Sequence, residues 1–240
     1  MKLFGKKALQ DQIKMDKNQI LLVHLFVNNK DLISYCNKQK LRTKVYHDYK
    51  FFDAFSDVNH QGVIVDLKQK EVKTLDLEDF LIKNQNKKQM LILMLDCIQD
   101  PHNFGAILRS ANAFGVDAVI YKRNNQVGLT NTVAKTSVGA INMLNLIEVS
   151  NLSNAINVLK KYKFWIYAST LSESSQDLNK VDFDKRSVII VGNEDSGISP
   201  LVIRNSDFHV KIKMYGNMQS LNVSVACGIL LYHIRSKMGK

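Results

Sequence analysis

Residues 212–226 read IKMYGNMQSLNVSVA, which predicts a strand, a polar loop containing Gly216, and then a largely apolar helix. Three polar side chains, Ser220, Asn222 and Ser224, fall where that helix should begin. A helix start carries unpaired N–H donors and the positive end of the helix dipole, so polar residues there suit a small polar or anionic ligand. Taken alone, the block favours a simpler interpretation, in which Ser220 is only the helix N-cap.

Two further blocks have the same strand–loop–helix pattern. The apolar run 90–95 leads into DCIQDPHNFGAILRSANAFG at 96–115, where Pro101 predicts a turn before a helix. Residues 188–200 read VIIVGNEDSGISP, an apolar run, a tight polar loop and a helix start at Pro200. The chain has only 2 prolines, and both fall at these strand-to-helix transitions.

The polar residues of the three blocks are expected to meet at one site, because ligands of open α/β sheets bind outside the carboxyl ends of the strands. The candidates are Asn103, Arg109, Gly192, Glu194, Ser220 and Asn222. Each has a structural alternative. Asn103 can be an N-cap, Glu194 a turn carboxylate and Arg109 a surface helix arginine, although only 6 of the 33 basic residues are Arg.

Beyond residue 90 the predicted elements alternate, which indicates an α/β domain with a parallel sheet and helices on both faces. Strands are expected at 90–95, 117–121, 144–149, 164–169, 187–192 and 208–213, and helices at 103–114, 130–137, 152–162, 199–205 and 220–237. Residues 1–72 are expected to form a small α/β domain, followed by a polar linker at 73–89 with a short helical patch around 77–82, and then the larger domain at 90–240. No two of the 11 glycines lie two residues apart, so the Rossmann Gly-x-Gly motif is absent.

The composition indicates a globular, cytoplasmic protein that binds a polyanion. The net charge is +11 over 240 residues, and residues 1–50 hold 11 Lys and Arg against 4 Asp. Biased codon usage is an alternative source of the lysines. No apolar run approaches the roughly 20 residues of a membrane span, the start lacks a signal-peptide core, and no Cys or His spacing suggests a metal. Candidate contacts to the phosphates of a nucleic acid are Lys6, Lys7, Lys38, Lys40, Arg42 and Lys44.

Together the three blocks resemble the SpoU (TrmH-like) family of SPOUT RNA methyltransferases. Its motifs are matched by Asn103, Gly105 and Arg109, by Gly192, Glu194 and Gly197, and by Met214, Gly216 and the run from Ser220 to Ser224. Lys213 stands where the family usually has proline. The segments Leu3-Phe4-Gly5 and His60-Gln61-Gly62-Val63 are similar to the ribosomal-protein-like RNA-binding domain of 23S rRNA guanosine 2′-O-methyltransferases.

The resemblance implies a deep trefoil knot in the larger domain, although true knots are otherwise essentially absent from proteins. It also implies a homodimer that uses S-adenosylmethionine to methylate a ribose 2′-hydroxyl, with a 23S rRNA guanosine as substrate and tRNA as the alternative. Backbone groups of Gly192, Ile212 and Leu221 should hold the cofactor, with Ser220 and Asn222 shaping the pocket.

The family gives the arginine matching Arg109 a base-like role, but a guanidinium stays protonated in proteins. We therefore expect Arg109 to bind phosphate and the 2′-oxygen electrostatically, with Asn103 orienting it and Glu194 pairing with it. Two other interpretations remain open. A non-catalytic RNA-binding or ribosome-assembly factor would keep the fold without the chemistry, and a small-molecule enzyme would leave the basic N-terminal segment unexplained.

Overall fold

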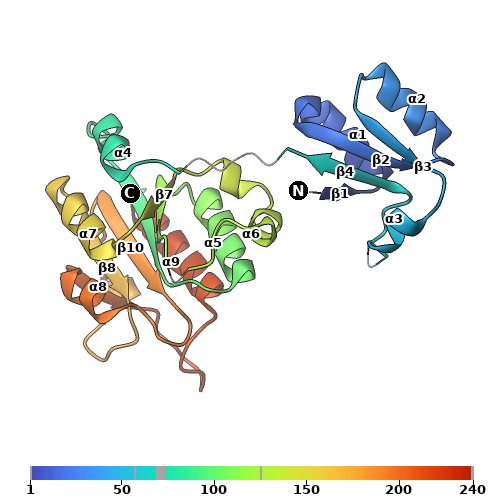
Figure 1. Cartoon of the computed structure of the whole chain (residues 1–240). Helices are drawn as coiled ribbons and strands as arrows, with labels where there is room; N and C mark the ends of the chain where they lie inside the picture. The colour runs from blue at the N-terminus through green and yellow to red at the C-terminus, as the bar shows by residue number, and fades with distance from the viewer. Residues whose placement is uncertain (1, 57, 69–73, 125, 239–240) are drawn as a thin grey trace. The chain divides into compact units, whose positions relative to one another are not determined.

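A computed structural model describes residues 2–56, 58–68, 74–124 and 126–238 of the chain. The chain divides into two compact units, Met1–Glu71 and Val72–Lys240 (Figure 1). Within the described residues, no helix is long and apolar enough to cross a membrane.

The first unit is a four-stranded sheet in the order β1-β4-β2-β3, in which β3 runs parallel to β2 and the other pairs are antiparallel. Its core contains Leu9, Val23, Leu25, Cys36 and Val65, all fully buried. The elements are β1 (Lys2–Phe4), α1 (Lys6–Asp16), β2 (Ile20–Phe26), α2 (Lys30–Lys38), β3 (Thr43–Tyr46), α3 (Lys50–Asp53) and β4 (Val63–Leu67).

The second unit is built on a seven-stranded sheet in which every pair is parallel, in the order β7-β6-β5-β10-β8-β11-β9. This confirms the predicted α/β class. The strands are β5 (Met90–Asp96), β6 (Ala118–Lys122), β7 (Leu146–Val149), β8 (Trp165–Ser169), β9 (Gln176–Asp177), β10 (Arg186–Gly192) and β11 (Phe208–Lys211). The helices are α4 (Leu77–Lys83), α5 (Pro101–Ala113), α6 (Asn131–Thr136), α7 (Leu152–Lys161), α8 (Pro200–Asn205) and α9 (Val223–Met238).

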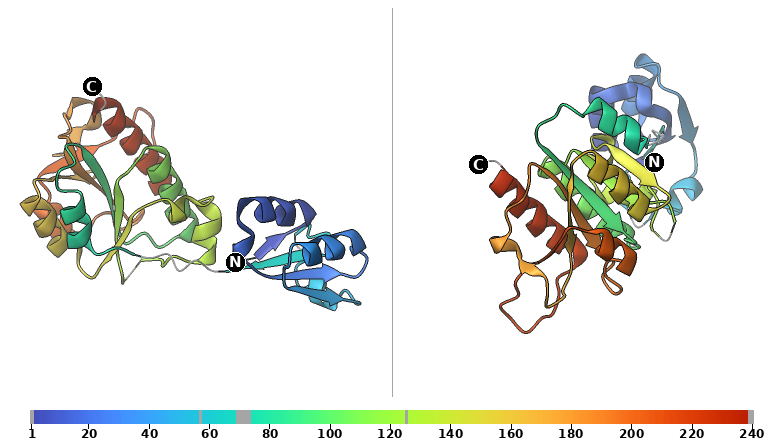
Figure 2. Two further views of the ribbon diagram at one scale, coloured as in Figure 1. Left: turned by 90° about the horizontal axis from the view of Figure 1, so that it is seen from above. Right: turned by 90° about the vertical axis from the view of Figure 1, so that its left-hand side faces the viewer.

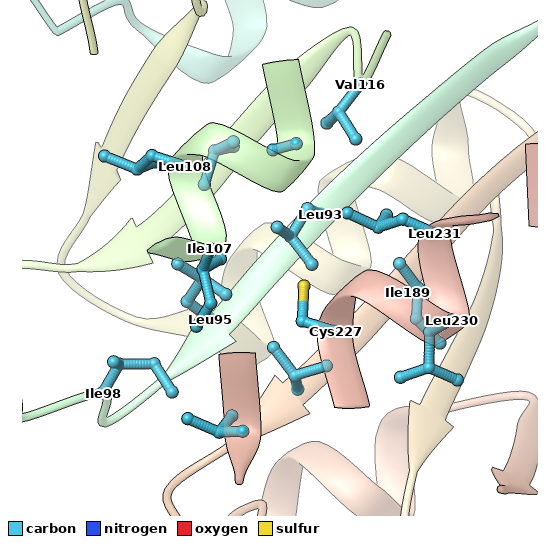
Figure 3. Close-up of a cluster of buried hydrophobic side chains, with 14 of the residues drawn as sticks. Leu93, Leu95, Ile98, Ile107, Leu108, Val116, Ile189, Cys227, Leu230 and Leu231 are labelled. Carbon is cyan, nitrogen blue, oxygen red and sulfur yellow. The ribbon is translucent and has the colours of Figure 1, made fainter. Parts of the chain in front are cut away.

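Helices cover both faces of this sheet (Figures 1 and 2), so its central strands are buried on both sides. Alternate residues of β5 enter separate cores. Leu93 and Leu95 pack with α5 and α9, including Leu230 (Figure 3), whereas Ile92 and Met94 pack with α4, α7 and α8. This two-sided burial explains why the strand reads as an uninterrupted apolar run.

The segment predicted as a linker with a short helical patch around 77–82 contains α4 at Leu77–Lys83. Its helix α4 buries Leu77, Phe80 and Leu81 in the core of the second unit. Asp76 caps this helix by accepting from the N–H groups of Glu78 and Asp79. Although polar residues flank α4 in the sequence, its apolar face packs against the second unit.

The C-terminal helix begins later than predicted, and its cap is different. It starts at Val223, not at Ser220. The Asn222 side-chain oxygen accepts from the N–H of Ser224 at 3.0 Å and from its hydroxyl at 2.6 Å, so Asn222 is the capping residue and Ser220 is not. Ser220 lies in the preceding loop, where its side chain remains available to a pocket.

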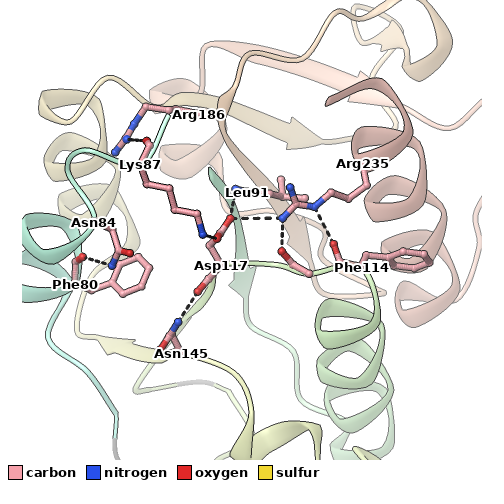
Figure 4. A network of polar contacts seen from close by, with 10 residues as sticks. Phe80, Asn84, Lys87, Leu91, Phe114, Asp117, Asn145, Arg186 and Arg235 are labelled. Atoms are coloured by element: carbon pink, nitrogen blue, oxygen red, sulfur yellow. Dashed lines mark hydrogen bonds and ion pairs between the residues drawn. The ribbon is translucent and has the colours of Figure 1, made fainter. Parts of the chain in front are cut away.

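The other end of α9 is fixed by a polar network around Asp117 (Figure 4). The Asp117 carboxylate accepts from the Leu91 N–H at 2.7 Å and pairs with Lys87 and Arg235. Arg235 also donates to the carbonyl of Phe114 at 2.8 Å. These contacts anchor the last turns of α9 to the α5–β6 connection, so both ends of the helix are held.

Candidate functional site

A pocket of about 410 Å³ lies where β8, β10 and β11 end, within the size range of small-molecule sites. Its walls come from residues 169–172 after β8, residues 191–198 at the end of β10, and the segment between β11 and α9. Ligands of parallel sheets bind at this edge. Five predicted site residues line the pocket, namely Gly192, Glu194, Ile212, Ser220 and Leu221.

The loop after β10 is shaped by two glycines. A Cβ on Gly192 would lie 2.3 Å from the carbonyl carbon and oxygen of Gly197, a contact that side chains do not make. Gly197 itself has φ of +68°, in the left-handed region that favours glycine. Asn193 and Gly197 then exchange two backbone hydrogen bonds of 3.0 Å, which close the loop against the pocket.

Asn193 holds this loop in place, although the sequence analysis did not single it out. Its side-chain nitrogen donates to the carbonyl of Cys97 at 3.0 Å, linking the loop to the end of β5. Its oxygen accepts from the N–H groups of Asp195 and Ser196 at 2.9 and 3.1 Å. The signal that could have identified it is an asparagine in a tight loop directly after a buried strand.

Asp96 provides a second link that the sequence analysis missed. This carboxylate is 2% exposed and accepts from the hydroxyl and the N–H of Ser199 at 2.6 and 2.8 Å. Ser199 thereby fixes the start of α8 to β5. Burial and the hydrogen bond to Asp96 raise the pKa of the neighbouring Cys97 thiol, which favours its protonated form.

Asn103, Glu194 and Asn222 form one hydrogen-bonded cluster that joins the three sequence blocks. One carboxylate oxygen of Glu194 accepts from the side-chain nitrogens of Asn103 at 3.1 Å and of Asn222 at 2.5 Å. It also accepts from the N–H of Val223 at 3.2 Å, and the Asn222 nitrogen donates to the Asn103 oxygen at 3.1 Å. Asp100 caps α5 at the N–H of Asn103, which positions that residue.

Arg109 lies outside this cluster and does not pair with Glu194 among the residues that the structure describes. Arg109 is exposed on α5, does not line the pocket, and makes no hydrogen bond or ion pair within the described part of the chain. Six residues of helix rotate a side chain by about 240° and advance it about 9 Å. Arg109 therefore points away from the direction that Asn103 takes toward Glu194.

The predicted RNA contacts of the first unit occupy several surfaces. Lys6 and Lys7 begin α1, and Lys38 ends α2. Lys44 lies over the Tyr46 ring at 5.2 Å, whereas Lys40 and Arg42 line a common pocket.

Aromatic side chains can stack on unpaired RNA bases, but those of the first unit mostly pack on one another. Phe51 stacks on Tyr46 and on His24 with centroid distances of 4.5 Å, and Phe52 is fully buried. Tyr49 is 42% exposed, which leaves part of its ring open to solvent. Most of this aromatic set therefore has a structural role in the first unit.

The fold and the pocket together define an α/β protein with a cofactor-sized site at the carboxyl edge of a parallel sheet. The model of the SpoU rRNA Methylase family matches residues 90–232. An uncharacterized tRNA/rRNA methyltransferase of Mycoplasma genitalium is 41% identical over 232 residues, covering 96% of this chain and 95% of that protein. The chain therefore belongs to the SpoU rRNA methylase family.

Solved structures agree with this assignment. The SpoU methyltransferase AviRb from Streptomyces viridochromogenes, in complex with AdoMet, matches with a TM-score of 0.70 at 17% identity, covering 99% of this chain and 90% of that one. This likeness concerns the fold. The A. aeolicus TrmH/SpoU tRNA modifying enzyme matches at 32% identity with a TM-score of 0.56, over 67% of this chain and 83% of that one.

Proposed function

We propose that this protein transfers a methyl group from S-adenosylmethionine to a ribose 2′-hydroxyl of RNA, with a guanosine of 23S rRNA as the substrate. The observation that carries the proposal is the cluster of Asn103, Glu194 and Asn222, which joins one residue from each family motif beside the pocket. Membership of the SpoU family supports the reaction class.

The residues of the pocket fit S-adenosylmethionine, which supplies a methyl group on an electrophilic sulfonium when it is bound. The backbone N–H and carbonyl of Leu221 form no hydrogen bond in the described part of the chain, so both are available to an adenine edge. Gly192, Ile212 and Ser220 complete the side of the pocket formed by the loops after β10 and β11. Glu194 and Asp195 add carboxylates that favour a cationic ligand.

The chain's own residues would align the ribose and stabilise the developing alkoxide. Arg109 has a guanidinium without an internal partner in the described residues, so it is free to bind a phosphate and the 2′-oxygen through charge-assisted hydrogen bonds. The 2′-hydroxyl proton would leave to phosphate or water. Asn103 and Asn222 would contact the ribose, with Glu194 holding both amides in place.

We further propose that the chain folds with a trefoil knot and acts as a homodimer. The knot is supported by membership of the SpoU family, for which the sequence resemblance implies it. The dimer is supported by an apolar strip on α9, where Val225, Ile229 and Tyr232 are 50%, 38% and 64% exposed. Such a strip at helical spacing suits a second copy.

The proposal is tested by transfer of labelled methyl from S-adenosylmethionine to unmodified total RNA, followed by mapping of 2′-O-methylation. One methylated guanosine in 23S rRNA is expected. Methylation confined to tRNA would favour the alternative substrate. The Mycoplasma genitalium relative is named a tRNA/rRNA methyltransferase, which is compatible with either substrate. Cofactor binding without transfer to any RNA would leave a non-catalytic RNA-binding factor.

The role of Arg109 needs its own variant. Arg109→Ala should lower the rate of methyl transfer about 100- to 1,000-fold, as for removal of one oxyanion donor, and leave cofactor affinity unchanged because Arg109 does not line the pocket. Arg123→Ala is the matched control, since Arg123 pairs with Glu148 on the surface. Full activity of the Arg109 variant would contradict the assignment.

A further inference from the structure

A second pocket, of about 490 Å³, opens at one end of the sheet in the first unit. The ends of three strands meet there, because β2 begins at Ile20, β3 begins at Thr43 and β4 ends at Leu67. The N–H of Lys68 donates to the carbonyl of Gln19 at 2.6 Å, which fixes the segment after β4 against the start of β2. The pocket is therefore framed by backbone whose position the sheet determines.

Four cationic side chains line this pocket, and they come from three separate segments. They are Lys17, Lys40, Arg42 and Lys68. None forms an ion pair within the described residues, whereas Lys2 in the same unit pairs with Asp66. Like charges gathered in a concave site repel one another and concentrate anions, so the pocket is suited to a polyanion.

The acidic residue nearest to the pocket in the sequence does not pair with these lysines. The two carboxylate oxygens of Asp16 accept from the N–H of Asn18 and from the side chain of Gln19, both at 3.0 Å. Asp16 thus serves the turn after α1. Its hydrogen bonds are made with neutral amides, which leaves the four cations without a carboxylate partner among the described residues.

Lys40 enters the pocket from the turn that ends α2, where its backbone is left-handed. Lys40 has φ of +58° and ends α2 in a Schellman arrangement, with its N–H bonded to the Asn37 carbonyl and the Leu41 N–H bonded to the Cys36 carbonyl. This position strongly favours glycine, and asparagine is the usual substitute. Lys163 has φ of +61° at the corresponding position after α7, so this backbone places Lys40 at the pocket but does not by itself mark it as functional.

We propose that this pocket binds the sugar–phosphate backbone of the RNA substrate and so gives the first unit a defined anchor. The inference rests on the proposed RNA substrate. Arg42 can hold a phosphate in a bidentate fork, while the lysines act as point charges on flanking phosphates. Of the six phosphate contacts expected from the sequence, Lys40 and Arg42 belong to this site, and the structure adds Lys17 and Lys68.

The test is a salt titration of RNA binding by the full-length protein, with an unmodified 23S rRNA transcript as the probe. One variant combines Lys17→Gln, Lys40→Asn, Arg42→Gln and Lys68→Gln. The control variant changes four exposed lysines outside the pocket to glutamine, so its total charge is the same. These control residues are Lys14, Lys50, Lys83 and Lys161.

Each lost phosphate contact should reduce the slope of log affinity against log salt by roughly 0.7, so the loss of the four cations in the pocket variant should reduce it by about 3. The control should change less. Lys40→Gly alone should weaken RNA binding yet keep or raise the melting temperature, because glycine suits the left-handed position.

Two outcomes would overturn the proposed anchor, and a third would exclude one residue from it. Equal slopes for the pocket and control variants, with wild-type methyl transfer intact, would refute the pocket and spare the proposed function. Lys40→Gly binding as tightly as wild type would remove Lys40 from the site. Wild-type protein that neither binds nor methylates RNA would overturn the proposed function and this inference with it.

Discussion

Replacing Asn222 separates two contributions of one side chain. Its oxygen caps α9 by accepting from the Ser224 N–H at 3.0 Å, while its nitrogen bridges Glu194 at 2.5 Å and Asn103 at 3.1 Å. Asn222→Ser keeps a good N-cap but is too short to bridge. Asn222→Ala removes both the cap and the bridge. Asn222→Asp keeps the cap and places an oxygen where the bridging nitrogen was.

The magnitudes follow from these contacts. Losing the cap costs about 1 kcal/mol, and losing the two bridging hydrogen bonds costs about 2 kcal/mol at the site. For the aspartate variant, two carboxylates 2.5 Å apart repel by about 7 kcal/mol at an effective dielectric of 20, falling to about 4 kcal/mol at 4 Å and about 1 kcal/mol in water. Because Glu194 and Asn222 are exposed to solvent, the repulsion between the two carboxylates should lie toward the lower end of this range of energies.

Methyl transfer and the melting temperature should therefore rank the variants differently. Asn222→Ser and Asn222→Ala should both lose about 30-fold in activity, since about 2 kcal/mol corresponds to that factor. The alanine variant alone should melt about 2–4 °C below the serine variant. Asn222→Asp should be the least active while retaining its cap. Wild-type activity in Asn222→Ser would refute the bridging role, because only the cap would then matter.

Three further changes can be checked in the same assays. Gly192→Ala should raise the cofactor dissociation constant, measured by calorimetry, at least about 10-fold, because the new Cβ would lie 2.3 Å from backbone atoms. Gly128→Ala is the control and should leave that constant unchanged, because its Cβ would meet nothing within 4 Å. Asp117→Ala should lower the free energy of unfolding in urea by about 2 kcal/mol, since it leaves the Leu91 N–H unpaired and removes the ion pair with Arg235. Burial alone would raise the pKa of Asp66, but the Lys2 and His24 contacts lower it. With its pKa lowered, Asp66 stabilises the folded state at pH values above its unfolded pKa of about 3.9, and this stabilisation is lost as the pH falls below that value. In an acid titration, the free energy of unfolding of Lys2→Ala should therefore fall less steeply than that of the wild type.

Much of the fold could be predicted from the sequence because its central strands are buried on both faces. The apolar runs expected at 90–95 and 187–192 correspond to Met90–Asp96 and Arg186–Gly192. Short elements carry too few residues to show a period, so Lys2–Phe4, Lys50–Asp53 and Gln176–Asp177 were missed.

The candidate site was predicted in outline, because strand ends and helix starts mark where polar residues of a parallel sheet gather. What the sequence could not supply were the specific partners. The expected ion pair of Glu194 is replaced by hydrogen bonds to Asn103 and Asn222. The wall formed by residues 169–172 was also missed, because Ser169 and Thr170 carry no spacing that distinguishes them from an ordinary loop.

The separation of Arg109 from the cluster has a consequence for catalysis. Arg109 follows Asn103 by six positions, which places the guanidinium on a different side of α5, and the intervening Phe104, Ile107 and Leu108 are buried in the core. That packing fixes the rotation of the helix, so Arg109 cannot turn toward Glu194 without exposing them. In the proposed reaction, Arg109 and the Asn222 cluster can therefore cooperate only through groups that extend between them, which makes the RNA backbone itself part of the alignment.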